Sequence, residues 1–159
     1  FMYPFMKRIT YWPQLFLGIT FNWGIIMSWT AINNSISPEI IILYISAIFW
    51  TLGYDTIYGA QDMSDDELIG LKSTSIKFKK HIKAFVALCY LITSLLIVYL
   101  FKEYFGLNLF SLFVFFFILS LYYQIFKFNE NHAHTCLKMF KCNNYSGLFL
   151  FLSIIFIDL

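Results

Sequence analysis

The feature that most constrains this chain is a series of long apolar blocks that contain almost no charged residues. Such blocks indicate membrane spans, because a helix needs about 20 residues to cross the hydrocarbon core of a bilayer. Each block is expected to be a helix, since an open strand would leave backbone groups unpaired in lipid. The predicted fold is therefore an all-α, polytopic transmembrane bundle. Five spans are predicted, at residues 14–32, 39–57, 84–101, 107–126 and 143–158.

The overall composition argues against a soluble domain. Hydrophobic residues make up 60% of the chain and charged residues only 13%, which is too few charges to form a hydrated surface. The three cysteines are an odd number and give no support to a disulfide framework.

The basic residues are distributed unevenly about the predicted spans. If the spans alternate in direction, only Lys102 falls on one side, and the other ten of the 11 basic residues share the opposite side. An excess of Lys and Arg marks the cytoplasmic side of a membrane protein. We therefore expect a bacterial cell inner membrane protein whose cytoplasmic segments are residues 1–13, 58–83 and 127–142.

The most informative polar segment is YDTIYGAQDMSDDELIGLKST, residues 54–74. Asp55, Asp62 and Asp66 would share one helix face if the second span continued past its membrane boundary. Carboxylates on one face repel each other unless a cation lies between them, and oxygen ligands suit Mg²⁺. Asp55 lies at the edge of the hydrocarbon, where an ionised group costs about 2.5–3.5 kcal/mol, so a functional role is expected. For Asp65 and Glu67, a solvated loop is the simpler interpretation.

Two further polar groups are candidate sites. Tyr3, Lys7 and Arg8 form either an interfacial anchor, with an aromatic ring at headgroup depth, or an anion clamp that faces the acidic segment. The segment His132 to Cys136 contains a His-x-His and a cysteine, but one such trio without a fourth ligand is a weak zinc motif.

Three segments carry a resemblance to a known family: YPFMKRITYWPQLFLGITFNWG, then YDTIYGAQDMSDDELIGLKST, then CLKMFKCNNYSGLFLFL. They resemble successive landmarks of the UbiA-type membrane prenyltransferases, and among these the enzymes that prenylate 4-hydroxybenzoate in ubiquinone biosynthesis. The first two segments are specific and the third is supportive. The resemblance covers essentially the whole chain and implies part of an all-helical bundle of nine spans.

The resemblance also implies roles for individual residues. Asp62 and Asp66 match the second Asp-rich motif, D-x-x-x-D, which binds the substrate diphosphate through Mg²⁺. Tyr3 and Lys7 match a Y-x-x-x-K motif that assists the diphosphate, and Asp62, Asp66 and Lys7 are the implied catalytic residues. Arg8 takes the place of a basic residue for the carboxylate of the acceptor, and Asp55 matches a further aspartate. The implied partners are polyprenyl diphosphate, 4-hydroxybenzoate and the lipid bilayer.

One departure from the family pattern changes the expectation for this polypeptide. The first Asp-rich motif, N-D-x-x-D-x-x-x-D, is absent, since no aspartate precedes Asp55. By the family layout the chain begins near the end of the fourth span. We therefore expect a fragment, or the product of a truncated or split gene, that is inactive unless a separate N-terminal half is supplied. The alternatives are a prenyltransferase with another aromatic or haem acceptor, a non-catalytic membrane protein, or the remnant of a decayed gene.

Overall fold

The computed structural model describes the backbone of residues 3–157 and the side chains of residues 5–157. Within this part of the chain every regular element is a helix. The elements in chain order are α1 (Tyr3–Ile9), α2 (Pro13–Phe21), α3 (Trp23–Asn33), α4 (Pro38–Ala60), α5 (Met63–Ile69), α6 (Thr74–Lys77), η1 (Lys79–His81), α7 (Ile82–Leu100), η2 (Lys102–Tyr104), α8 (Leu109–Lys127) and α9 (Ala133–Ile155).

Four helical segments are long and apolar enough to cross a membrane. They are α2 with α3, then α4, then η1 with α7, and then α8, and they coincide with the first four predicted spans. Large apolar side chains such as Leu95 and Phe126 stand exposed on their outer faces, as contact with lipid requires. The chain is therefore an integral, multi-pass membrane protein, and the predicted all-α transmembrane bundle is confirmed.

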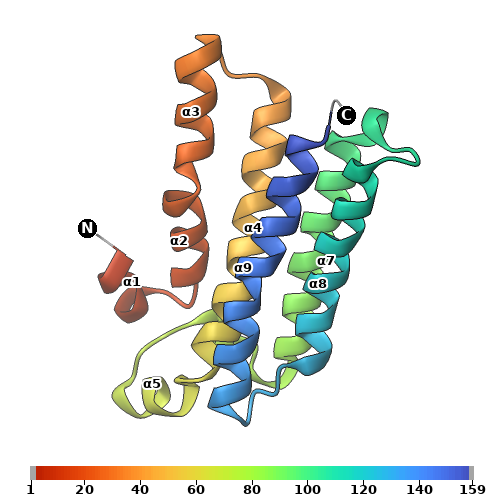
Figure 1. Cartoon of the computed structure of the whole chain (residues 1–159). Helices are drawn as coiled ribbons and strands as arrows, with labels where there is room; N and C mark the ends of the chain where they lie inside the picture. Colours follow the sequence, from red (N-terminus) through yellow and green to blue (C-terminus); the bar gives the residue numbers. More distant parts are fainter. Residues whose placement is uncertain (1–2, 158–159) are drawn as a thin grey trace.

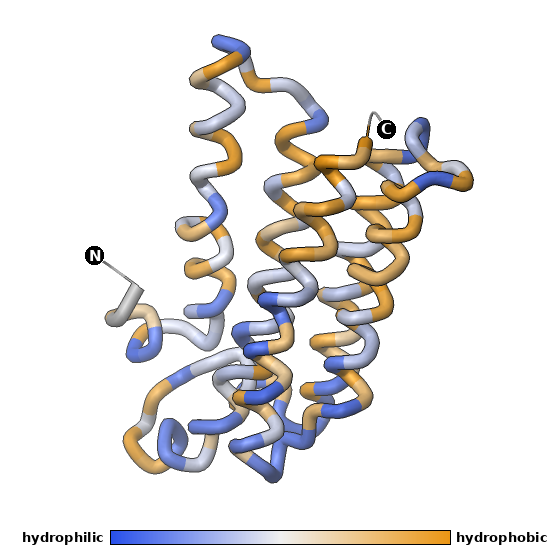
Figure 2. The backbone as a smooth tube through the Cα atoms, in the orientation of Figure 1, coloured by the Kyte–Doolittle hydropathy of each residue, from blue (hydrophilic) through white to orange (hydrophobic). Residues whose placement is uncertain are grey.

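The fifth predicted span differs from the structure at its start. Helix α9 begins at Ala133, well before residue 143, and it is not among the four segments that meet the length and hydropathy conditions. Its first half carries Lys138 and Lys141, and only its second half is apolar, a gradient that Figure 2 shows along the helix. Hydropathy predicts only the part of a helix that can lie in lipid. The helix itself extends as far as its backbone hydrogen bonds do, and here that includes the polar residues before 143.

Helix α4 is the centre of the arrangement. It packs against α7 and α9 on one side and against α2 and α3 on the other, while α8 packs against α9 (Figure 1). The short helices α1 and α5 lie at the same end of the bundle. The break between α2 and α3 falls at Asn22, whose Nδ2 donates to the Gly18 carbonyl at 2.8 Å and to Thr51 Oγ1 of α4 at 2.8 Å.

The bundle interior combines tight packing with buried polar side chains. Tyr90 of α7 lies against Gly53 of α4, where an added Cβ would come within 2.7 Å of the ring atom Cδ1. The Tyr90 hydroxyl donates to Gln124 Oε1 at 2.8 Å, and Gln124 Nε2 donates to Ser146 Oγ at 3.0 Å. These bonds join α7, α8 and α9 in apolar surroundings, where interhelical hydrogen bonds contribute about 1 kcal/mol each.

Hydrophilic residues are concentrated at the end of the bundle that holds α1, α5 and the turn between α8 and α9 (Figure 2). The α4–α7, α1–α2 and α8–α9 connections all lie at this end, so the segments that contain ten of the basic residues are brought together. Lys102, in η2, lies at the opposite end. We call the first the basic end and the second the η2 end.

Candidate active site

The acidic segment spans the break between α4 and α5. Asp55 lies in the last turns of α4 and is buried, with 8% of its surface exposed. The helix ends at Ala60, and Asp62 occupies the N-cap position of α5. The prediction that Asp55, Asp62 and Asp66 share one helix face is therefore wrong, because α4 does not continue through this segment.

The break follows from packing at the end of α4. A Cβ at Gly59 would come within 2.8 Å of Ser75 Oγ and 3.1 Å of Gln14 Nε2, so α6 lies directly against α4 here. Helix α6 is held there by Ser75 Oγ, which donates to the Thr56 carbonyl at 2.8 Å. Gln14 Oε1 accepts from the Thr74 backbone N–H at 3.0 Å. A straight α4 would carry the chain away from these partners.

Asp62 and Asp66 remain one helical turn apart in α5, as their four-residue spacing predicts. The Asp66 backbone N–H donates to the Asp62 carbonyl at 2.8 Å, so the two residues lie one turn apart. Asp65 and Asp66 occupy the first turn of α5, where negative charge is favourable. Asp66 is buried, and Asp65 is exposed. The interpretation of Asp65 as a solvated residue agrees with this exposure.

Lys7 of α1 lies against Asp66 although 59 residues separate them in the chain. Its Nζ donates to Asp66 Oδ2 at 3.0 Å, and the side chains are 32% and 9% exposed. The Lys7 carbonyl accepts from the Lys72 backbone N–H at 2.7 Å, which holds α1 against the loop after α5. The first helix therefore faces the acidic segment through Lys7.

The remaining predicted site residues lie outside this contact. Arg8 is exposed, and it forms no salt bridge with any part of the chain that the structure describes. Tyr3 is the first residue of α1, but its side chain lies outside the described residues. Asp62 Oδ2 accepts a long hydrogen bond of 3.4 Å from Gln61 Nε2. Glu67 forms an exposed salt bridge with Lys79 at 2.6 Å.

Neither predicted metal site has a complete set of ligands in the structure. Among residues 5–157, no group of three or more His, Cys, Asp or Glu side chains is close enough to hold an ion. His132 and His134 are exposed, while Cys136 is buried and its Sγ donates to the Asn129 carbonyl at 3.3 Å. The weak zinc motif therefore does not converge.

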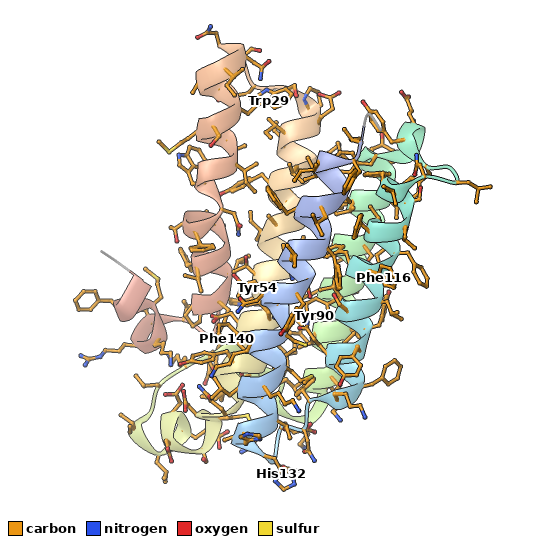
Figure 3. All side chains as sticks on the ribbon, viewed as in Figure 1. Trp29, Tyr54, Tyr90, Phe116, His132 and Phe140 are labelled. Carbon is orange, nitrogen blue, oxygen red and sulfur yellow. The ribbon has the colours of Figure 1, made fainter. Side chains whose placement is uncertain are left out.

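A pocket of about 280 Å³ that the sequence did not predict is lined in part by Tyr54, the residue before Asp55. It lies between α4, α9 and the junction of α2 with α3. Tyr54 of α4 and Phe140 of α9 lie side by side in its wall, with ring centroids 5.8 Å apart (Figure 3). The four-residue spacing of Trp50, Tyr54 and Tyr58 was the available signal, but inside an apolar block it is also the pattern of ordinary helix packing.

The fold and this site define an integral membrane protein that collects carboxylates and a lysine at one end of a helical bundle. Residues 1–155 match the UbiA prenyltransferase family, and the chain belongs to that family. The family expected from the three sequence segments is therefore confirmed.

Individual relatives are longer than this chain. The mitochondrial 4-hydroxybenzoate polyprenyltransferase of Bos taurus is 40% identical over 96% of this chain and 42% of its own length. The 4-hydroxybenzoate octaprenyltransferase of Vibrio campbellii is 36% identical over 98% of this chain and 55% of its own length. The chain thus spans about half the length of these curated relatives.

A solved structure shares the fold. The apo structure of a UbiA homologue from Aeropyrum pernix K1 superposes with a TM-score of 0.77. It covers 97% of this chain and 58% of its own, at 21% sequence identity. At that identity the likeness bears on the architecture alone.

Proposed function

We propose that this chain forms part of a prenyltransferase that moves a polyprenyl group from polyprenyl diphosphate to the ring of 4-hydroxybenzoate, in ubiquinone biosynthesis. The observation that carries the proposal is the contact between Lys7 and Asp66, at 3.0 Å. It joins the two segments that resemble the diphosphate-binding motifs of the family. The names of the relatives supply the substrate class.

Lys7 and Asp66 would act on the diphosphate. The Lys7 ammonium is partly exposed, so it can turn from the Asp66 carboxylate toward a phosphate oxygen. There it would stabilise the charge that develops as the allylic C–O bond breaks and its electron pair leaves with the diphosphate. The ring carbon beside the phenol hydroxyl then forms the new C–C bond, and loss of the ring proton restores aromaticity.

Asp62 and Asp66 are the residues that would hold Mg²⁺. Their carboxylate oxygens are the ligand type that Mg²⁺ prefers, and two carboxylates are the usual protein share of such a site. The remaining positions would be filled by waters and by oxygens of the diphosphate. When bound, the ion supplies positive charge that favours departure of the diphosphate. The donor set thus fits the ion as a partial site.

Further residues would contact the two substrates. Arg8 is exposed, and its planar guanidinium suits bidentate contact with the carboxylate of 4-hydroxybenzoate. Asp55, buried near the end of α4, would be a further substrate-binding residue. The prenyl chain would lie against Tyr54 and Phe140, whose rings exclude water from a cation that water would capture.

The activity is proposed for this chain together with the further segment that its longer relatives carry. The chain spans about half of their length, and a membrane preparation that holds it alone is expected to give no turnover. We place it in a bacterial cell inner membrane with the basic end in the cytoplasm, supported by the position of ten basic residues at that end.

The test is prenylation of 4-hydroxybenzoate by membranes that hold the chain and this further segment. Lys7→Met and Asp66→Asn are each expected to lower kcat about 100-fold or more, the usual loss when one charge-stabilising group is removed. Lys79→Met, which breaks the exposed bridge to Glu67, is the matched control and should retain activity. Full activity in both site variants would refute the assignment, and preference for another aromatic acceptor would correct the substrate.

A further inference from the structure

Two adjoining pockets lie at the η2 end, far from the acidic segment. One, of about 280 Å³, is lined by residues of α3, α4 and α7 and by the segment around Phe101. The other, of about 390 Å³, lies over the start of α4 and the turn at η2. Glu39, Leu100 and Tyr104 line both, so the two pockets form one continuous cleft. We call it the η2 cleft.

The part of the η2 cleft between α3, α4 and α7 is apolar, and a hydrogen-bond donor that lacks an acceptor is buried in its wall. Ile40, Leu43 and Leu100 form much of its wall. Trp29 of α3 also lines it (Figure 3), and its indole Nε1 is buried with no hydrogen-bond partner among the described residues. A buried donor without a partner costs about 1–3 kcal/mol. A ligand that carries an oxygen acceptor on an apolar body would remove this cost.

The part of the η2 cleft over the start of α4 and the turn at η2 carries charges of both signs. Glu39, Glu103 and Lys102 all line it. No salt bridge joins them in the part of the chain that the structure describes. Instead, Lys102 Nζ lies 5.6 Å from the centroid of the Tyr99 ring. The cleft thus presents one cation and two carboxylates that do not pair with each other. Such a set of charges suits a headgroup that carries both a positive and a negative charge.

We propose that the η2 cleft binds one phospholipid with a phosphate and a primary amine in its headgroup. The ammonium would contact Glu39 and Glu103, and the phosphate would contact Lys102. An ester carbonyl would accept the Trp29 N–H, and an acyl chain would lie along Ile40 and Leu43. This lipid is favoured over an anionic one because two carboxylates line the cleft and an anionic headgroup brings no cation to them. The proposal does not depend on the proposed enzymatic activity.

The position of the cleft along the bundle agrees with a lipid headgroup. It lies where α3 ends, α4 begins and α7 ends, which is the boundary of the apolar segments. Tyr99, Tyr104 and Trp29 are there, and such rings are enriched at the level of lipid headgroups. A lipid can therefore reach the cleft from the leaflet at the η2 end without leaving the bilayer.

Native mass spectrometry of the detergent-purified protein tests the proposal. The protein is mixed with equal amounts of phosphatidylethanolamine, phosphatidylcholine and phosphatidylglycerol of identical acyl chains. We expect one phosphatidylethanolamine per chain to be retained about five-fold more than either of the others, since ion pairs at partly exposed sites are modest. Phosphatidylcholine keeps the positive charge but cannot donate a hydrogen bond, so it reports the part played by the amine protons. Equal retention of the three lipids by the unmodified protein would overturn the proposal.

Variants locate the bound lipid. Glu39→Gln is expected to remove most of the preference for the amine lipid, and Trp29→Phe to lower its retention about three-fold while keeping the apolar surface. Trp23→Phe, on the same helix but in an exposed position beside Tyr44, is the matched control and should bind as the unmodified protein does. Selective binding that neither Glu39→Gln nor Trp29→Phe affects would place the lipid elsewhere and refute the assignment to this cleft.

Discussion

At the scale of single residues, two ion pairs differ in how far their side chains are buried. The Lys7–Asp66 bridge joins α1 to α5 and includes a carboxylate that is 9% exposed. The Lys79–Glu67 bridge is shorter, at 2.6 Å, but its side chains are 52% and 36% exposed. Water screens the second pair, so its length says little about its energy. In the first pair, loss of Lys7 would leave the largely buried Asp66 carboxylate unpaired.

This difference predicts unequal effects on stability. Lys7→Met is expected to lower the free energy of unfolding by about 1–3 kcal/mol, less than for a fully buried pair because Lys7 is partly exposed. Lys79→Met should change it by less than about 1 kcal/mol. Thermal unfolding of the purified variants measures both. Equal losses in the two variants would contradict the assignment of Asp66 to the protein interior.

The cysteines of α9 give a prediction on reactivity. Burial raises the pKa of the Cys136 thiol, which the neighbouring hydroxyl of Thr135 only partly offsets. Because the thiolate is the reactive form, alkylation of Cys136 by iodoacetamide should require a higher pH than that of a free thiol. Cys142 is only partly buried and should be modified first. Peptide mass spectrometry after timed alkylation, with a denatured sample as control, measures the order; faster modification of Cys136 would contradict it.

At the scale of elements, the short helices at the basic end depend on tertiary contacts. Helices α1, α5 and α6 contain 7, 7 and 4 residues, and helices this short are unstable alone. Gln14 of α2 holds the loop after α5 through the Thr74 backbone, and Lys72 holds it to α1. Ser75 of α6 holds the same segment to α4 through the Thr56 carbonyl, so the position of Asp66 depends on contacts with α1, α2 and α4.

Gln14→Leu tests this dependence. The variant removes the acceptor of the Thr74 N–H and leaves a buried donor unpaired, at a cost of about 1–3 kcal/mol. We expect faster hydrogen exchange in residues 70–78, with the bundle helices unchanged. Gln61→Leu, whose amide makes only a long contact with Asp62, is the control. Exchange in the loop that is unchanged by Gln14→Leu would show that the other contacts suffice.

A glycine in α4 gives a second prediction at this scale. Gly53→Ala would force a methyl group against the Tyr90 ring, which its hydrogen bond to Gln124 prevents from moving freely. We expect a loss of about 1–3 kcal/mol in unfolding free energy from overpacking. Gly24→Ala in α3 has nothing within 4 Å of the new Cβ and should stabilise the helix slightly. Chemical denaturation of the two variants compares them, and equal stability would contradict the tight packing of α4 on α7.

These elements also show what could be predicted from the sequence. Four spans were predictable because length and hydropathy alone decide whether a helix suits lipid. The break after Ala60 was not, since it depends on α6, which packs against Gly59. The contact of Lys7 with Asp66 joins residues 59 apart, and the sequence offered it only as the anion-clamp alternative and through the family resemblance. The start of α9 was missed because its first half is too polar to register as a span.

At the scale of the whole molecule, the two ends of the bundle have different chemistry. The basic end holds the carboxylates, Lys7 and Arg8, and the η2 end holds the mixed-charge cleft around Glu39. The proposed substrate, a polyprenyl diphosphate, has a charged head that would lie at the basic end and an apolar tail that must remain in lipid. The direction of insertion therefore decides from which compartment a water-soluble acceptor can reach the site.

The charge distribution predicts this direction. With ten basic residues at one end, that end should remain in the cytoplasm and the turn that contains Leu107 should lie outside. In a background with Cys89, Cys136 and Cys142 replaced by Ala, Leu107→Cys should react with a membrane-impermeant maleimide added to intact cells, because Leu107 is fully exposed. Ser64→Cys, on an exposed position of α5, should react only after the membrane is opened. Reaction of Ser64→Cys in intact cells would reverse the orientation, and the proposed site would then face away from a cytoplasmic supply of 4-hydroxybenzoate.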